Sequence, residues 1–322
     1  MEHLLKLSDL SGGEILALLD LADRLKRDRA NGVELPLLRG KTLAMLFEKA
    51  STRTRVSFEC AMAGLGGHAV VLNASETQLG RGEPEEDTAR VLGRYCDAIM
   101  LRTFSQKTVE TFAFFAGVPV INGLTDEAHP CQALADLMTI REVKGCLAGR
   151  KLAFVGDGNN VASSLVAGAL ACGMSVSFAA PKGYAPPADV LAFAAKEYPG
   201  KFRLTDNVRE AAENADVLAT DVFASMGQEG ERNERLAAFS GYQLNEKTLS
   251  FAKPDAMVQH CLPAHRGEEI TADVFEAHAD EIFAEAENRM HAQKAVLLSL
   301  LDGEAANRLR ASARLFPKKQ VG

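Results

Sequence analysis

The stretch Phe47-Glu-Lys-Ala-Ser-Thr-Arg-Thr-Arg-Val-Ser-Phe-Glu59 joins an apolar run to the start of a helix and decides the fold of the first half of the chain. Leu43 to Phe47 predicts a short buried strand, and the residues from Val56 onward begin a helix. Residues 51–54 therefore lie at a helix N-terminus, which offers backbone N–H groups and a positive dipole. Hydroxyl and guanidinium groups at this place predict a phosphate site. An N-cap with solvated arginines is the alternative.

Length, composition and charge are those of a globular enzyme with two domains or one large one. The chain has 322 residues, of which 47% are hydrophobic and 25% charged. A net charge of −7 argues against general nucleic-acid binding, so an anionic ligand needs a locally cationic site. We see no signal peptide and no membrane span. The six cysteines form no C-x-x-C pair, which indicates reduced thiols and a cytoplasmic protein.

Strands alternate with helices along both halves, which predicts an α/β fold with two doubly wound parallel sheets. An opening helix is expected over 12–29. In the first half the predicted strands are 42–47, 69–72, 98–101 and 118–121, and the predicted helices are 53–64, 85–95, 107–116 and 131–144. Gly145 to Arg150 indicates a hinge. The strands predicted after it are 151–155, 175–179, 202–205, 216–220 and 257–260.

The predicted domains are residues 1–146 and 147–289, joined by interdomain helices, with the active site in the cleft between them. A final helix over about 287–301 carries an apolar stripe that includes Met290 and Leu297. Because this stripe needs a surface to cover it, we expect residues 290–322 to pack back on the first domain.

Polar side chains follow several of the predicted strands, and ligands of open parallel sheets bind beyond the carboxyl ends of the strands. Arg102 suits an anion or oxyanion contact, and a surface ion pair is the alternative. His129 precedes Pro130 at a helix start and can donate to a carbonyl oxygen; otherwise it is a capping or core histidine. Gln132 can hold an amide of a substrate, and Asn160 a small polar ligand.

The segment Asp221-Val-Phe-Ala-Ser-Met-Gly227 follows another apolar run. A carboxylate at Asp221 would attract an amino group, and Ser225 with the Met226 backbone can fix a carboxylate or an amine. A strand-end cap is the alternative reading of Asp221. Cys261 lies in His260-Cys-Leu-Pro263, and on residue type alone it is a small buried hydrophobe.

A metal site is not predicted, because the spacing of the candidate ligands matches no common zinc pattern. These candidates are His129, Cys131, His260, Cys261 and His265.

A dinucleotide site is also not predicted. Gly156 and Gly158 follow a strand, but Val161 holds the third glycine position. The next strand ends in Ala-Ala-Pro at 179–181, without an acid for a ribose hydroxyl. We therefore expect no NAD and no other cofactor.

Six motifs stand in one order along the chain: Ser-Thr-Arg-Thr-Arg from 51, Asp-Thr-Ala-Arg-Val-Leu from 87, His-Pro-Cys-Gln from 129, Gly-Asp-Gly-Asn-Asn from 156, Ser-Met-Gly from 225 and His-Cys-Leu-Pro from 260. Together they resemble the aspartate/ornithine carbamoyltransferase family over nearly the full chain. The resemblance implies a carbamoyl phosphate site formed by Ser51, Thr52, Arg53, Thr54, Gln78, Arg102, His129, Gln132, Cys261, Leu262 and Arg289. It implies an ornithine site formed by Asn160, Asp221, Ser225 and Met226. The implied catalytic residues are Arg102, His129, Cys261 and Asp221.

The resemblance also implies transfer of the carbamoyl group to the δ-amine of L-ornithine, giving L-citrulline and phosphate in arginine biosynthesis. It implies a homotrimer in which a neighbouring subunit lends Gln78, and Arg289 resembles the family's last carbamoyl phosphate contact. From the residue pattern we expect Arg289 to begin the last long helix. A putrescine carbamoyltransferase, a nucleotide-dependent oxidoreductase and a non-catalytic binding homologue are the alternatives.

The attacking amine must be neutral, and deprotonating an alkylamine with a pKa near ~10.4 at pH 7 costs roughly 4–5 kcal/mol. Cys261, Asp221 and the leaving phosphate are candidates to take its proton.

Overall fold

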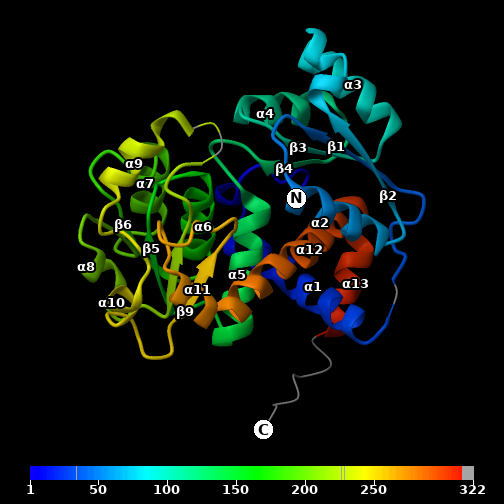
Figure 1. The fold of residues 1–322 in the computed structure, drawn as a ribbon. Helices are drawn as coiled ribbons and strands as arrows, with labels where there is room; N and C mark the ends of the chain where they lie inside the picture. Colours follow the sequence, from blue (N-terminus) through cyan, green and yellow to red (C-terminus); the bar gives the residue numbers. More distant parts are fainter. Residues whose placement is uncertain (34, 226, 228, 314–322) are drawn as a thin grey trace. The chain divides into compact units, whose positions relative to one another are not determined.

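The computed structural model describes residues 1–33, 35–225, 227 and 229–313, and the chain forms two compact units (Figure 1). The first unit contains Met1–Cys131 and the chain from Arg289 onward, and the second contains Gln132–Asn288. Each unit has its own parallel sheet with helices against it, which confirms the predicted fold class. The domain borders at 146 and 289 stay a prediction.

The first unit contains a four-stranded parallel sheet in the order β2-β1-β3-β4. Its strands are β1 (Thr42–Phe47), β2 (His68–Asn73), β3 (Ala98–Arg102) and β4 (Val120–Leu124). Its helices are α1 (Gly12–Ala30), α2 (Thr52–Ala63), α3 (Glu85–Tyr95), α4 (Gln106–Phe115) and α13 (Gly303–Ala313). Short 3-10 turns span Leu7–Asp9, Ala74–Glu76 and Leu79–Arg81.

Alternation along β1 explains how this sheet is covered. Ala44 and Leu46 pack with Ile99 against Val109 and Phe112 of α4, and α3 and α4 lie together on that side of the sheet (Figure 1). This arrangement follows from the period of two in a strand, since both faces of a parallel sheet must be apolar. The predicted strand 118–121 is observed later in the chain, at Val120–Leu124, because Pro119 has no N–H to give to the sheet.

The second unit contains a five-stranded parallel sheet in the order β7-β6-β5-β8-β9. Its strands are β5 (Lys151–Val155), β6 (Ser175–Ala179), β7 (Phe202–Thr205), β8 (Val217–Thr220) and β9 (Met257–His260). Its helices are α6 (Asn160–Ala171), α7 (Ala188–Glu197), α8 (Val208–Ala212), α9 (Arg232–Ala238), α10 (Glu246–Leu249) and α11 (Ala272–Ala277), with a 3-10 turn at Glu229–Glu231.

Both sheets reverse their strand order beside the first strand of the series, at β1/β3 and at β5/β8. The carboxyl ends of strands at such a reversal form the place where open α/β sheets bind ligands. In the first sheet these ends lead to Ser51 and Arg102. In the second sheet they lead to Asn160 and Asp221.

Two helices carry the chain from one unit to the other: α5 (Pro130–Lys144) and α12 (Ala279–Leu301). The expectation that Arg289 begins the last helix is wrong, because α12 starts at Ala279. Residues 279–288 contain no glycine or proline that would stop a helix, and Asp280 and Glu281 favour its N-terminus. None of the described helices is both long and apolar enough to cross a membrane.

Candidate active site

The N-terminus of α2 is the centre of a cationic cluster in the first unit. Ser51 is the N-cap, and its hydroxyl accepts a hydrogen bond from the Thr54 amide at 3.2 Å. The Thr54 hydroxyl is fully buried and accepts from the guanidinium groups of Arg102 at 3.3 Å and Arg289 at 2.9 Å. The sequence therefore correctly predicted a strand-to-helix junction with hydroxyl and guanidinium groups at one place.

His129 lies next to the same cations. The pKa of its imidazole is well below 6.5, first because the ring is buried and then because Arg289, Arg102 and Arg53 repel a proton. A neutral imidazole keeps one N–H that can polarise a carbonyl oxygen without adding a fourth positive charge. The structure thus gathers Arg53, Arg102, His129 and Arg289, four of the predicted carbamoyl phosphate residues.

Other predicted residues of the first unit are more exposed. Thr52 opens α2 with its side chain exposed, and Gln78 lies on an exposed turn after β2. Within the described residues the Gln78 side chain makes no hydrogen bond to the cationic cluster. Its role as a residue lent by a neighbouring subunit stays a prediction.

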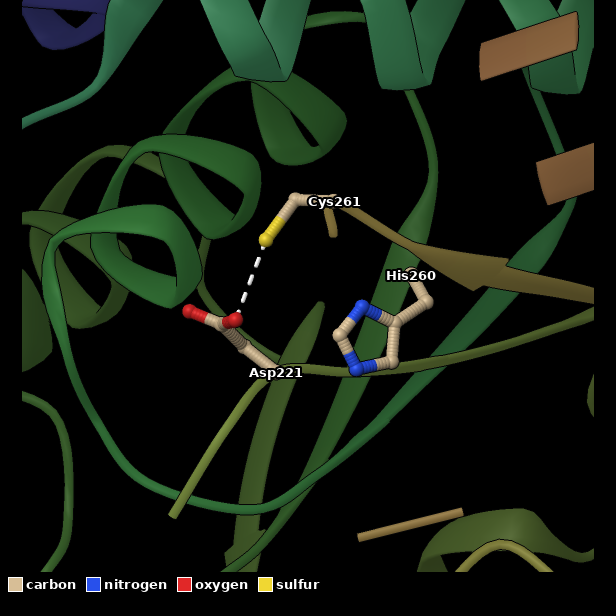
Figure 2. A group of neighbouring side chains, drawn as sticks. All are labelled: Asp221, His260 and Cys261. Atoms are coloured by element: carbon tan, nitrogen blue, oxygen red, sulfur yellow. Dashed lines mark hydrogen bonds between the residues drawn. The ribbon is translucent and has the colours of Figure 1, made fainter. Parts of the chain in front are cut away.

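A carboxylate and a thiol meet in the second unit, at the carboxyl ends of β8 and β9. Figure 2 shows Cys261 and Asp221 pointing toward one another, and the thiol donates to Asp221 Oδ1 at 3.0 Å. The side-chain amide of Asn159 donates to Asp221 Oδ2 at 2.7 Å, and the backbone N–H of Val222 donates to Asp221 Oδ1 at 2.8 Å. Asp221 is therefore a buried carboxylate that the surrounding donors hold in one orientation.

The Cys261 thiol keeps its proton in this environment. Burial raises its pKa well above 9, and the Asp221 and Glu285 carboxyl groups add to the rise. A thiol that donates to a carboxylate is a poor proton acceptor. Among the side chains considered for the amine proton, the geometry therefore favours Asp221 over Cys261.

Two further predicted ornithine residues, Asn160 and Ser225, lie at the carboxyl ends of the same sheet. Asn160 opens α6, and its Oδ1 accepts from the Val161 amide at 2.8 Å. Ser225 is half-buried in the chain that follows β8. Met226 lies outside the described residues.

The turn after β9 is held by His260. Its Nδ1 accepts from the Leu262 amide at 3.0 Å, so Nε2 carries the proton that faces Glu269 Oε1 at 3.0 Å. Asp221, His260 and Cys261 offer donor atoms within 4.8 Å of one another, as a metal site would require. Both imidazole nitrogens already have protein partners, so this geometry does not favour a metal ligand at His260.

Three buried acids that sequence reasoning missed lie near this turn: Asp136, Glu269 and Glu285. Gln132 Nε2 donates to Asp136 Oδ1 at 2.7 Å and to Glu285 Oε1 at 2.9 Å. Glu285 Oε2 accepts from the His260 amide at 3.1 Å. A usable signal was present for Asp136, which stands in the otherwise apolar helical run 133–138.

Gly158, which follows β5, is required by a close contact within the chain itself. A Cβ on Gly158 would lie 2.3 Å from the Pro186 nitrogen and 2.5 Å from the Ala185 carbonyl oxygen. The Gly158 amide donates to the Tyr184 carbonyl at 2.9 Å. The close approach that Gly158 permits is therefore made by residues 184–186 and not by a pyrophosphate, which argues against the oxidoreductase alternative.

One doubly wound unit contains a cluster of cations that suits an anion, and the other contains a buried carboxylate that suits an amine. This combination is typical of an α/β transferase with two substrates. The sequence matches the Aspartate/ornithine carbamoyltransferase, carbamoyl-P binding domain over residues 2–142 and the Asp/Orn binding domain over residues 148–300. The chain belongs to the aspartate/ornithine carbamoyltransferase family.

Several relatives of this chain are named ornithine carbamoyltransferase. The ornithine carbamoyltransferase of Carboxydothermus hydrogenoformans is 55% identical over 92% of this chain and 96% of its own. That of Bacillus subtilis is 54% identical over 93% of this chain and 94% of its own. The solved ornithine carbamoyltransferase of Pyrococcus furiosus has a TM-score of 0.89 and 52% identity, covering 94% of this chain and 97% of that one.

Proposed function

We propose that this chain transfers the carbamoyl group of carbamoyl phosphate to the δ-amine of L-ornithine, giving L-citrulline and phosphate. The buried Asp221 carboxylate, held by Asn159 and Cys261 in the second unit, carries the choice of amine. A carboxylate there attracts a substrate with a second amino group. A relative specific for aspartate would need cations at this position instead. The shared name of the relatives supports the same choice.

The cationic cluster of the first unit holds the donor substrate. Phosphate binds at the N-terminus of α2 on residues 51–54, with Arg102 and Arg289 neutralising its charge. Arg102, His129 and Thr54 polarise the carbamoyl oxygen, on which negative charge develops during attack. Gln132, Cys261 and Leu262 complete the donor site, as the family resemblance implies.

The acceptor binds on Asn160, Asp221, Ser225 and Met226. Its neutral δ-nitrogen attacks the carbamoyl carbon, forms the new C–N bond and gives a tetrahedral intermediate. The bond from this carbon to the phosphate oxygen then breaks, and phosphate leaves with that electron pair. The amine loses its proton to Asp221 or to the leaving phosphate. Transfer requires the bound amine to lie within bonding distance of the carbamoyl carbon.

A product assay tests this proposal. Purified protein with carbamoyl phosphate should form citrulline from ornithine, and neither carbamoylputrescine from putrescine nor carbamoylaspartate from aspartate at a comparable rate. Carbamoylputrescine as the main product would overturn the choice of ornithine. Putrescine lacks the α-carboxylate, so the comparison isolates the contacts made to that group.

We further propose that the reaction serves arginine biosynthesis and that the chain acts as a homotrimer with Gln78 lent by a neighbour. Gln78 lies on an exposed turn, as a residue that serves another subunit must. Mixing a Gln78→Ala variant with an Arg102→Met variant should restore activity if subunits exchange, because some sites then receive both wild-type residues. A monomeric protein with full activity would refute this assembly.

A further inference from the structure

Two acids that the proposed mechanism does not use are buried side by side in the second unit. Asp136 of α5 is 2% exposed and Glu285 of α12 is 1% exposed. Burial raises the pKa of Glu285 well above its usual range, and the charge of Asp136 and the hydrogen bond between the two carboxyl groups raise it further. The rise favours a proton held between the two carboxyl groups over two adjacent negative charges.

The acid pair fixes the amide of Gln132. Both oxygens that face Gln132 Nε2 belong to carboxyl groups, Asp136 Oδ1 at 2.7 Å and Glu285 Oε1 at 2.9 Å. Exchanging the nitrogen and oxygen of this amide would place three oxygens together, so the contacts decide its orientation. Gln132 Oε1 is buried and accepts no hydrogen bond from the described residues. A buried acceptor of this kind calls for a donor, and a ligand can supply it.

Stability alone does not account for the pair. Two buried carboxyl groups cost more to desolvate than apolar side chains of the same volume, which often stabilise a protein more. The pair also accepts the His260 amide at Glu285 Oε2, so it supports the turn that carries Cys261 and Leu262. The acid pair thus contacts two predicted substrate-binding segments, the start of α5 at Gln132 and the turn after β9.

We propose that Asp136 and Glu285 are positioning residues that aim Gln132 Oε1 at the carbamoyl NH₂ group and so select carbamoyl phosphate over acyl phosphates. This inference rests on the proposed donor substrate. The carbamoyl NH₂ group can donate a hydrogen bond. Acetyl phosphate carries the same phosphate, but in place of the NH₂ group it has a methyl group of similar size, which cannot donate. A site built to bind a donor rejects the analogue that lacks it, because its own acceptor is then left unsatisfied.

The experiment compares the affinities of two ligands by calorimetry. The wild-type protein should bind carbamoyl phosphate more tightly than acetyl phosphate. Asp136→Ala should weaken carbamoyl phosphate binding about tenfold and leave acetyl phosphate within about twofold, since one hydrogen bond is worth about that ratio. Asp136→Asn keeps an acceptor oxygen for Gln132 and should retain most of the preference. Adding Asp136→Ala to Gln132→Ala should cause no further loss, because Asp136 acts through Gln132.

A matched control exists in the same two helices. Glu142 of α5 accepts from the Asn288 amide of α12 at 2.7 Å, and no substrate contact is predicted for either. Glu142→Gln should leave the ratio of the two affinities unchanged. If Asp136→Ala does not fold, Glu285→Gln gives the same test. The new side chain has one acceptor oxygen in place of two, so it cannot accept hydrogen bonds from both Gln132 and the His260 backbone.

Equal weakening of both ligands, an Asp136→Asn variant as impaired as Asp136→Ala, or additive losses in the double variant would each overturn the inference. Wild-type protein that binds carbamoyl phosphate but forms no citrulline from ornithine would refute the proposed function and leave this binding test intact. Wild-type protein that does not bind carbamoyl phosphate would overturn both.

Discussion

Each unit buries a titratable group beside charged neighbours, and these neighbours are cations in the first unit and acids in the second. His129 lies among Arg53, Arg102 and Arg289, which lower its pKa, whereas Cys261 lies near Asp221 and Glu285, which raise the pKa of its thiol. Desolvation acts in the same sense as these neighbours in each case, since it disfavours the charged form. Each group therefore stays neutral. The charges left beside the two groups are the guanidinium groups of Arg53, Arg102 and Arg289 in the first unit and the Asp221 carboxylate in the second, and each set is opposite in sign to the substrate group proposed to bind there.

The largest effect that would test this comparison is expected at Arg102. Arg102→Met should lower kcat/KM for carbamoyl phosphate about 10³-fold, because a guanidinium that contacts the developing charge is lost. The unliganded protein should not lose thermal stability, since a crowded cation is removed. Steady-state kinetics and a melting curve measure both.

Arg55→Met is the control for that variant. Arg55 lies on α2, the helix that carries Thr54; it is exposed and approaches Glu59 at 3.6 Å. Kinetics close to those of the wild type are expected. An equal loss in both variants would show that general positive charge, and not the cluster around Thr54, binds the donor.

The second effect concerns Asp221. Asp221→Asn should lower kcat/KM for ornithine about 10²-fold, because the amine loses its charged partner, and should leave the affinity for carbamoyl phosphate unchanged. Asp157→Asn is the matched control. Asp157 is a neighbouring buried carboxylate that pairs with Arg235 at 3.0 Å, and burial raises its pKa to about 6. If both variants lose ornithine activity alike, the negative field of the unit and not the contact with Asp221 selects the amine.

A smaller effect is expected at Cys261. Cys261→Ala removes the donor to Asp221 and should lower kcat about tenfold, the ratio that corresponds to one hydrogen bond near the reacting atoms. Cys261→Ser keeps a donor and should lose less. The measurement is kcat as a function of pH with saturating substrates. An unchanged kcat and an unchanged pH profile in Cys261→Ala would remove the cysteine from the mechanism.

The smallest effect is a pH dependence of stability caused by His129. Its pKa is lower in the folded protein than the value of about 6.5 in the unfolded chain, so the unfolded chain takes up the proton first as the pH falls. This contribution to stability is complete above about pH 7.5 and is lost as the pH falls below it, by about 0.8 kcal/mol at pH 6 for an imidazole that stays neutral in the folded protein. When the pH falls from 7.5 to 6, the free energy of unfolding of the His129→Gln variant should therefore decrease less than that of the wild-type protein. Parallel denaturant titrations at both pH values check this, and identical slopes with pH would contradict it.

Much of the fold was predictable because its signals are local. The apolar runs at β1, β5 and β6 were predicted at the residues where the strands occur, and polar junctions after β1 and β5 mark the turn to a helix. Ser51 could be assigned to a helix start for the same reason. The Arg289 error shows where local signals end. The apolar stripe from Met290 onward was visible, but the helix that carries it begins at Ala279 among residues with no such stripe.

The acid pair could not be predicted because its members are far apart in the sequence. Asp136 and Glu285 belong to α5 and α12, and only the tertiary fold shows that both face Gln132. The pattern around Asp136 indicates a buried charge but not its partner. The tautomer of His260 was equally hidden, since it depends on Glu269 and on the backbone of Leu262.

The first unit is discontinuous along the chain, whereas the second is one uninterrupted segment. A ribosome therefore delivers all of residues 132–288 before it delivers Arg289. At synthesis rates of about 5–20 residues per second, Thr54 waits roughly 12–47 s for one of its two guanidinium partners. The half of the protein that is translated later is thus the first able to complete its folding. A nascent chain halted just before Arg289 would contain every residue of the second unit but lack the last segment of the first.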